Sequence, residues 1–283
     1  MTRYALDPAT PVLLRPDGAV QVGWDPRRAV LVQPPPGLTA TTLADLLRTM
    51  QSGATLADLK AAARLRGLAG DSAITALMSS LVDSGLVRIV GHRRGRSASI
   101  RIHGRGPLSD LLASALRCSG ARITHSSQTH AGASAQHTDL VVLSDNLVAD
   151  PRVVREVHGA GIPHLPVRVR DGSGLVGPLV IPGVTSCLGC ADLHRSDRDA
   201  AWPAVAAQLR HSVGTADRAT LLATAALALN QVDRVIHAVS GTGADRHQQA
   251  PATLDTTLEF DVDVGAVVAR RWSRHPRCPQ CNR

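Results

Sequence analysis

The chain has 283 residues, of which 44% are hydrophobic and 19% are charged, a balance that suffices for two ordinary domains and excludes an intrinsically disordered protein. Its net charge of +8 comes almost entirely from scattered arginines, since Lys60 is the only lysine, so binding of nucleic acid along a basic stripe is not indicated. The first residues lack the apolar segment of a signal peptide, and no run of about 18 apolar residues could cross a membrane, which together predict a cytoplasmic protein.

Short strands open the chain. Two apolar runs flank the turn pair Asp17-Gly18, which predicts a β-hairpin over residues 11–23. A third apolar run, residues 28–33, ends at three consecutive prolines. Leucine and alanine then recur at helical spacing. We expect three helices that begin near Thr39, Thr55 and Asp71, followed by a strand over residues 86–90.

Three strands, three short helices and a final strand form a winged-helix pattern over residues 1–92. This pattern resembles the small PqqD-like domain that recognises the leader peptides of ribosomally made natural products. The resemblance implies that a leader adds as an extra strand to an exposed sheet edge. Two alternatives stay open. The domain could bind DNA through its second helix, which carries Lys60, Arg64 and Arg66, or it could only pack against its neighbour.

The segment after this pattern is rich in arginine. It reads His-Arg-Arg-Gly-Arg from His92 onward, and we interpret residues 93–97 as a charged linker, with contact to a phosphate or an acidic partner as the alternative. Residues 98–283 then form the second predicted domain.

A glycine turn opens the second domain, between a strand over residues 98–103 and a helix over residues 110–117. A G-x-G-x-x-G turn in this context holds phosphate on backbone amides. Here Gly104 and Gly106 are present, but Ser109 stands in the third glycine's place. The proline that directly follows Gly106 has no N–H to donate to a phosphate. The turn therefore predicts a strand-to-helix crossover more securely than it predicts a bound nucleotide.

Alternating strands and helices follow. The strand over residues 120–125 is not followed by the acidic residue that would hold a ribose. Further strands are expected over residues 138–144, 161–168 and 175–181. The first of them ends in Asp145 and Asn146. This alternation predicts a parallel sheet with helices on both faces. Ligands bind beyond the carboxyl ends of such strands, where Gly104 and Asp145 would meet.

Four of the five cysteines form two C-x-x-C pairs, Cys187 with Cys190 and Cys278 with Cys281. Two such pairs can close a tetrahedral four-sulfur shell around Zn²⁺, and a closed shell is structural because it leaves no position for water. In a cytoplasmic protein zinc is favoured over the alternatives, which are two redox pairs or two disulfides. Cys118 is left over and is expected to be buried and inert.

Two helices and a hairpin are expected between the cysteine pairs. The helices begin near residue 204 and span residues 216–239, and the hairpin strands span residues 254–260 and 264–272. The long helix carries an apolar stripe, namely Leu222, Ala226, Leu229, Val232 and Ile236. Pairing of subunits in a homodimer and packing within one chain both explain this stripe.

The order of a glycine turn, a strand ending in Asp145-Asn146, a Gly-Ile-Pro strand and two cysteine pairs resembles the ThiF-like, ubiquitin-activating-type superfamily. More narrowly, the chain is similar to the cyclodehydratase C-type proteins, which couple a PqqD-like domain to a degenerate ThiF-like, Rossmann-type domain. Active members of the superfamily adenylate a C-terminal carboxylate with ATP and Mg²⁺, and Asp145 matches their magnesium-handling aspartate. Because the ribose acid, a lysine and the third glycine are missing, the resemblance implies a vestigial nucleotide site made of Gly104, Gly106, Ser109, Asp145 and Asn146.

These observations lead to one preferred function and two alternatives. The preferred hypothesis is a non-catalytic component that captures the leader of a ribosomal precursor peptide and presents it to a YcaO-type partner enzyme. The first alternative is an active adenylyltransferase that acts on a peptide or small-protein C-terminus. The second alternative is a winged-helix regulator that binds DNA.

Overall fold

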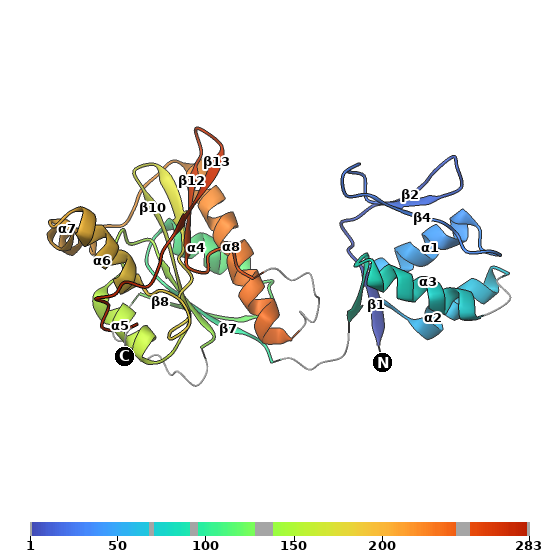
Figure 1. Cartoon of the computed structure of the whole chain (residues 1–283), viewed down its shortest axis with the longest axis horizontal. Helices are drawn as coiled ribbons and strands as arrows, with labels where there is room; N and C mark the ends of the chain where they lie inside the picture. Colours follow the sequence, from blue (N-terminus) through green and yellow to red (C-terminus); the bar gives the residue numbers. More distant parts are fainter. Residues whose placement is uncertain (1, 68–70, 91–95, 128–137, 242–249, 282–283) are drawn as a thin grey trace. The chain divides into compact units, whose positions relative to one another are not determined.

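The computed structural model describes residues 2–67, 71–90, 96–127, 138–241 and 250–281. These residues divide into two compact units, the first formed by the described residues up to 90 and the second by those from 96 onward. Figure 1 shows the elements of each unit. None of the helices in the described ranges combines the length and the apolar character that crossing a bilayer requires.

The first unit contains two three-stranded antiparallel sheets and three helices. One sheet has the order β2 (Val12–Leu14), β3 (Val20–Val22), β4 (Val30–Val32). The other has the order β5 (Ala54–Thr55), β1 (Arg3–Leu6), β6 (Val87–Val90). The helices are α1 (Ala40–Gln51), α2 (Leu56–Leu65) and α3 (Asp71–Asp83). The predicted hairpin, third strand, three helices and final strand are confirmed.

Strand β1 was not predicted. Its four residues carry no turn signal and no alternation, and they are extended because they pair with β6 along their whole length and with β5 at Arg3 and Tyr4. A strand defined by partners that lie about 50 and 80 residues away leaves no local pattern.

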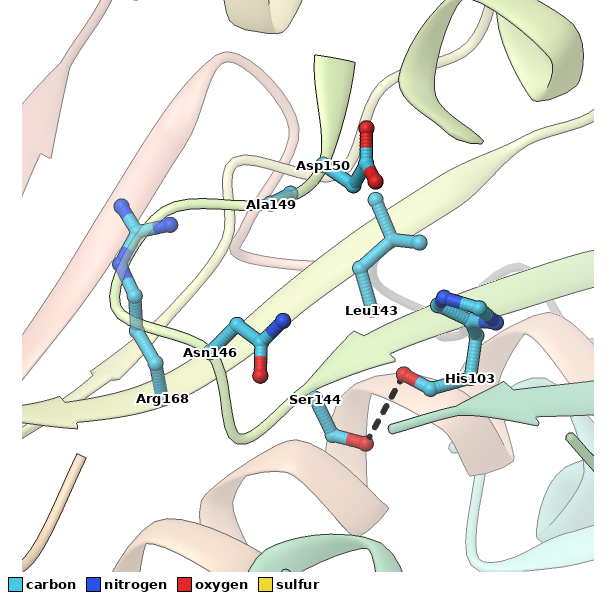
Figure 2. A pocket seen from close by; sticks show the side chains of 7 residues that line it. All are labelled: His103, Leu143, Ser144, Asn146, Ala149, Asp150 and Arg168. Atoms are coloured by element: carbon cyan, nitrogen blue, oxygen red, sulfur yellow. Dashed lines mark hydrogen bonds between the residues drawn. The ribbon is translucent and has the colours of Figure 1, made fainter. Parts of the chain in front are cut away.

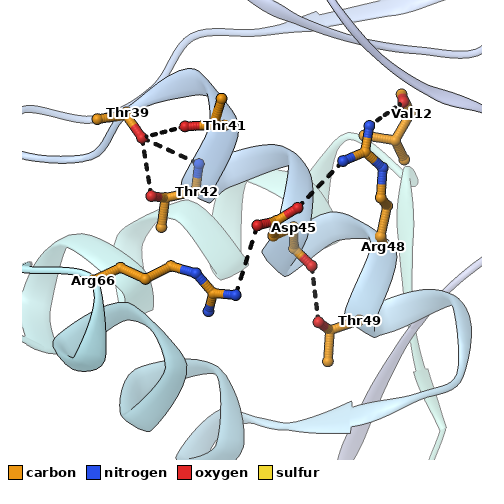
Figure 3. Close-up of polar contacts among 8 residues, drawn as sticks. All are labelled: Val12, Thr39, Thr41, Thr42, Asp45, Arg48, Thr49 and Arg66. Carbon is orange, nitrogen blue, oxygen red and sulfur yellow. Dashed lines mark hydrogen bonds and ion pairs between the residues drawn. The ribbon is translucent and has the colours of Figure 1, made fainter.

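Polar side chains of α1 fasten this helix to strand β2 (Figure 3). Thr39 caps the helix by accepting the backbone N–H of Thr42. At the other end, Arg48 donates to the carbonyl of Val12 at 3.0 Å and to Asp45 at 3.2 Å. Strand β2 is therefore covered along one edge by α1, whereas β4 is the opposite edge strand of the sheet in its described part.

The second unit is built on a seven-stranded sheet. Its order is β13 (Ala266–Arg271), β12 (Thr256–Asp261), β11 (Ser173–Val176), β10 (His164–Arg170), β9 (Leu140–Ser144), β7 (Ser99–His103), β8 (Arg122–Ser126). The strands from β10 to β8 are parallel, and those from β10 to β13 are antiparallel.

The prediction of a parallel sheet is therefore confirmed for β7, β8, β9 and β10. It is wrong for the strand expected over residues 175–181, which begins at Ser173 as β11 and is antiparallel to β10. The cause is the pair Asp171-Gly172, which joins β10 to β11 as a two-residue loop with both φ angles positive, 51° and 79°. Asp-Gly in this setting is a hairpin signal that reverses the chain at once, so no crossover helix follows β10.

Helices cover both faces of the sheet, as predicted (Figure 1). Helices α4 (Pro107–Leu116) and α8 (Arg218–Ser240) pack with Ile100, Val142 and Val167 on one face. Helix α5 (Pro151–Gly159) packs with Val141 and Leu143 on the other. Neighbouring residues of β9 thus pack into hydrophobic cores on opposite faces of the sheet, because side chains alternate across a strand.

The buried face of α8 differs in part from the predicted stripe. Val232 and Ile236 are buried, but Leu222 and Ala226 are exposed, and the helix buries Ala225 and Ala228 in their place. The helix lies so close to β11 that a Cβ on Gly174 would collide with Thr224. This close approach sets the rotation of the helix, so packing within one chain accounts for its buried face.

Two short helices, α6 (Leu188–Arg198) and α7 (Trp202–Leu209), lie between the cysteine pairs. Helix α7 matches the helix expected near residue 204, but α6 was not predicted. Its sequence has no apolar stripe and buries only Cys190 and Ala191, because side chains of the cysteine cluster, and not an ordinary core, cover it.

Most of the predicted linker, residues 93–95, lies outside the described residues. Arg96, which belongs to the described end of this linker, forms an ion pair with Asp139, whose side chain also accepts the backbone N–H of Ser99 at 2.9 Å. These contacts lower the pKa of Asp139 although burial opposes the shift. The last arginine of the basic run is therefore used within the second unit.

Candidate functional site

The predicted nucleotide residues converge where β7 and β9 end. Asp145 follows β9 with a positive φ of 73° and is buried. Its carboxylate accepts the backbone N–H of Leu108 at 2.9 Å and that of Ser109 at 3.3 Å. These are the first free amides of α4, the groups that would hold a phosphate at a helix N-terminus. The chain's own carboxylate occupies that position.

The two glycines of the turn make this contact achievable. A Cβ on Gly104 would lie 2.7 Å from Oδ2 of Asp145, and a Cβ on Gly106 would lie 2.8 Å from Oδ1. Ser109, in place of the third glycine, accepts the N–H of Gly106 at 3.1 Å and donates its hydroxyl to the carbonyl of Gly106 at 2.8 Å. The turn is therefore closed by internal hydrogen bonds.

The crevice at the strand ends is small (Figure 2). It has a volume of about 10 Å³ and lies between His103, Asn146, Asp150 and Arg168, with Leu143 and Ser144 behind them. A cavity of this size holds roughly one water molecule. Burial lowers the pKa of His103, and the nearby charge of Arg101 lowers it further. The residues in this arrangement do not fit a nucleoside triphosphate.

The four cysteines of the two C-x-x-C pairs lie together, as predicted, with all four sulfurs within 4.8 Å of one another. Sγ of Cys187 is 3.7 Å from Sγ of Cys190 and 3.5 Å from Sγ of Cys278, and Sγ of Cys190 is 3.5 Å from Sγ of Cys281. A tetrahedron with Zn–S bonds of about 2.3 Å has edges of about 3.8 Å. The four thiols are free, and their spacing fits a single zinc ion.

Burial and backbone amides shift the pKa values of two of these thiols. Burial raises the pKa of Cys187. Burial also acts on Cys278, but the backbone N–H groups of Gln280 and Cys281 outweigh it and lower the pKa of this thiol. Amides that point at sulfur stabilise the thiolate, which is the form that binds metal.

A hydrogen-bonded cluster fixes the second cysteine pair to helix α6. His275 lies 2.8 Å from Asp197, and Arg277 forms an ion pair with the same carboxylate. Nδ1 of His275 accepts the backbone N–H of Arg277 at 3.1 Å, so Nε2 carries the proton and donates it to Asp197. His194 lies 3.1 Å from the carbonyl of Ser273.

The second unit also contains a much larger hollow that was not predicted, with a volume of about 840 Å³. We call it the arginine groove. Seven arginines and three aspartates line it, together with Trp202 and aliphatic side chains. The only local signal is the alternation of valine and arginine from Val167 to Arg170, which places Arg168 and Arg170 on one face of β10. Cys118, expected to be buried, is exposed, because it lies beyond the last buried turn of α4.

Comparisons with known proteins found similar folds among solved structures but no related sequence. No protein-family model and no curated protein matches the chain. The heterocyclase TruD matches 99% of this chain and 43% of its own, with a TM-score of 0.71 at 17% identity. A heterocyclase solved with substrate and cofactor matches 99% of this chain and 40% of its own, with a TM-score of 0.72 at 15% identity.

Escherichia coli MccB, solved with an MccA derivative, matches 99% of both chains with a TM-score of 0.60 at 14% identity. MccB has also been solved with ATP. The chain thus spans about two fifths of the length of the heterocyclases and nearly all of MccB. At these identities the likeness shows that the chain shares the fold of these proteins.

Proposed function

We propose that this protein is the non-catalytic, peptide-binding component of a system that makes thiazole- or oxazole-type rings in a ribosomal precursor peptide. The first unit, as a PqqD-like domain, binds the leader, and the second unit, as a degenerate ThiF-like domain, presents the peptide to a YcaO-type enzyme. The fold shared with a heterocyclase supports the link to ring formation. The fold shared with MccB, which was solved with MccA, supports a peptide partner.

The observation that carries the non-catalytic role is the position of the Asp145 carboxylate. It bonds to the amides of Leu108 and Ser109, where a phosphate would be held. A carboxylate in that place repels the anion and takes its donors. The crevice beside it holds roughly one water, so ATP binding would require both the loop and the carboxylate to move.

Strand β4 of the first unit supports the leader-binding role. The other edge strand of the same sheet, β2, is covered by Arg48 and Gln51, which donate to the carbonyls of Val12 and Thr10. An edge strand with exposed apolar side chains is the surface on which an extended peptide pairs through its backbone. Leu31 on β4 is 53% exposed.

We assign the four-cysteine cluster a structural zinc ion. The ion joins the first turn of α6 to the segment that follows β13. Four sulfur ligands complete a tetrahedral shell and leave no position for a reacting water.

An active adenylyltransferase remains the second candidate because MccB, with the same fold, was solved with ATP. Calorimetry with ATP and Mg²⁺ decides between the two. We expect no heat of binding at ATP concentrations up to about 1 mM. At these concentrations the measurement would detect any dissociation constant below about 1 mM. Micromolar binding that is lost in Asp145→Ala would refute the non-catalytic role.

Leader binding is tested with a fluorescently labelled candidate precursor peptide, chosen from the short reading frames that adjoin this protein's gene. Leu31→Asp should weaken binding of the labelled leader by about tenfold or more, since it places a charge on the apolar docking surface. Leu65→Asp is the matched control, because Leu65 is 88% exposed on α2 of the same unit. Equal binding by both variants would exclude the β4 edge as the leader site.

A further inference from the structure

The arginine groove lies entirely within the second unit. Its walls come from the segment after β9, from α5, β10, α6, α7 and β13, and from the segment of the second cysteine pair. At about 840 Å³ it has the size of a ligand site. It adjoins the crevice at the strand ends, because Ala149 and Arg168 line both hollows.

The groove carries an excess of positive charge. Of its seven arginines, Arg195 is paired with Asp192 at 2.8 Å, and Arg170 and Arg270 share Glu259 at 2.9 and 3.7 Å. The remaining four form no ion pair with any residue in the ranges that the structure describes: Arg155, Arg168, Arg198 and Arg210. Of these four, Arg168 is half-buried and the other three are exposed. Guanidinium groups without counter-charges attract an anionic ligand.

Arg195, one of the seven arginines of the groove, is held in a fixed orientation. The guanidinium of Arg195 lies 5.2 Å from the ring centre of Trp202 and 4.8 Å from that of Trp272. Asp192 also accepts the indole N–H of Trp202 at 3.2 Å. Stacking on aromatic faces and a shared carboxylate leave the arginine fork preorganised for a further oxygen ligand.

Arg168 lies close enough to Arg195 for the two positive charges to act on each other. Burial, followed by the charge of Arg195, lowers the pKa of Arg168 to about 10. The group stays charged at neutral pH, and a carboxylate placed between the two guanidinium groups would relieve their repulsion.

We propose that the arginine groove binds an extended, acidic peptide segment whose carboxylates meet Arg168 and Arg195. Guanidinium forks match carboxylates in a bidentate geometry, and the aliphatic walls beside them, formed by Leu147, Val154 and Leu188, accept the alternate side chains of an extended chain. Single-stranded nucleic acid would need several aromatic platforms, and Trp202 is the only aromatic residue among those lining the groove. The inference deepens the proposed function and rests on it in assigning the segment to the captured precursor.

The test uses the full chain and a fluorescein-labelled peptide of sequence ELEELE, followed by fluorescence anisotropy. The neutral peptide QLQQLQ is the ligand control. Arg168→Gln and Arg195→Gln remove the two proposed contacts. Arg271→Gln is the matched protein control, because Arg271 is exposed and follows the groove residue Arg270 on β13, so its side chain lies on the other face.

We expect ELEELE to bind, to bind more weakly as salt rises, and to lose about tenfold or more in affinity in each groove variant, since each loses charge-assisted hydrogen bonds. QLQQLQ should not bind, and Arg271→Gln should behave as the wild type. Equal binding of both peptides, no effect of either groove variant, or tighter groove-dependent binding of oligothymidylate or ATP would overturn the inference.

The outcome is separable from that of the proposed function. Leu31→Asp in the first unit should leave ELEELE binding unchanged while it weakens leader binding. If ELEELE binds as expected but the precursor does not bind at all, the groove stands and the proposed function falls. If the precursor binds through β4 and ELEELE does not bind, only the groove inference falls.

Discussion

Replacing Asp145 by alanine tests whether this carboxylate is part of the fold or part of a nucleotide site. The substitution removes the acceptor for two backbone amides at the start of α4. Hydrogen bonds to a charged group contribute about 1.5–3 kcal/mol each, and loss of a helix cap costs about 0.5–2 kcal/mol. Alanine also tolerates the positive φ of this position poorly, at a cost of about 1 kcal/mol.

Because these contributions overlap, we expect Asp145→Ala to lower the free energy of unfolding of the second unit by about 3–4 kcal/mol. For a unit of this size the midpoint of thermal unfolding should fall by about 10 °C. Asp145→Asn keeps one side-chain acceptor and tolerates the same φ, so it should lose about 1–2 kcal/mol. The fluorescence of the buried Trp272 and calorimetry report this transition.

The matched control is Asp110→Ala, since Asp110 lies in the same first turn of α4 but is exposed. It should change the unfolding free energy by less than about 1 kcal/mol. An Asp145→Ala protein as stable as the Asp110→Ala protein would refute the capping role. If that variant also lost a measurable affinity for ATP, Asp145 would belong to a working nucleotide site.

Three further substitutions test the metal cluster, a buried histidine and a close helix contact. Cys278→Ser should reduce bound zinc from about one ion per chain to nearly none and lower the unfolding midpoint, whereas Cys118→Ser should change neither. Elemental analysis of the purified proteins measures the zinc content. A wild-type protein that contains no metal and is as stable as the Cys278→Ser variant would contradict the zinc assignment. Burial lowers the pKa of His164 from 6.5 to about 4, so the unfolded chain takes up a proton first as the pH falls. The free energy of unfolding should therefore drop by about 2–3 kcal/mol between pH 7 and 4.5. Urea unfolding should show a smaller drop in His164→Gln, and the same pH dependence in both proteins would show that His164 is not the cause. Gly174→Ala forces a methyl group into Thr224 and should lower the free energy of unfolding by about 1–3 kcal/mol. The control Gly159→Ala, whose added methyl group meets nothing within 4 Å, should be neutral by the same urea measurement. Equal effects of the two substitutions would mean that α8 does not lie against β11.

The order and type of most elements follow from local pattern. The hairpin around Asp17-Gly18, the three helices after it and the strands before the glycine turn were predicted because turn residues and apolar periodicity are properties of a few consecutive residues. The meeting of the two cysteine pairs was predicted for a different reason. Their matched spacing encodes one tetrahedral shell although 87 residues separate them.

The reversal at Asp171-Gly172 could also have been read from the sequence, because Asp-Gly between two strands is a hairpin signal. Strand β1 and the rotation of α8 could not. The first is extended only because distant strands pair with it, and the second is set by the contact of Gly174 with Thr224 across 50 residues.

The sequence by itself determined which residues stand in the glycine turn and which donors are missing from it. Only the tertiary structure decided that Asp145 fills the turn, and that scattered arginines from five segments line one groove. The physical reason is the same in both cases. Hydrogen bonding and electrostatic attraction act over a few ångströms in space, and the chain brings these groups together only when its sheet and helices have packed.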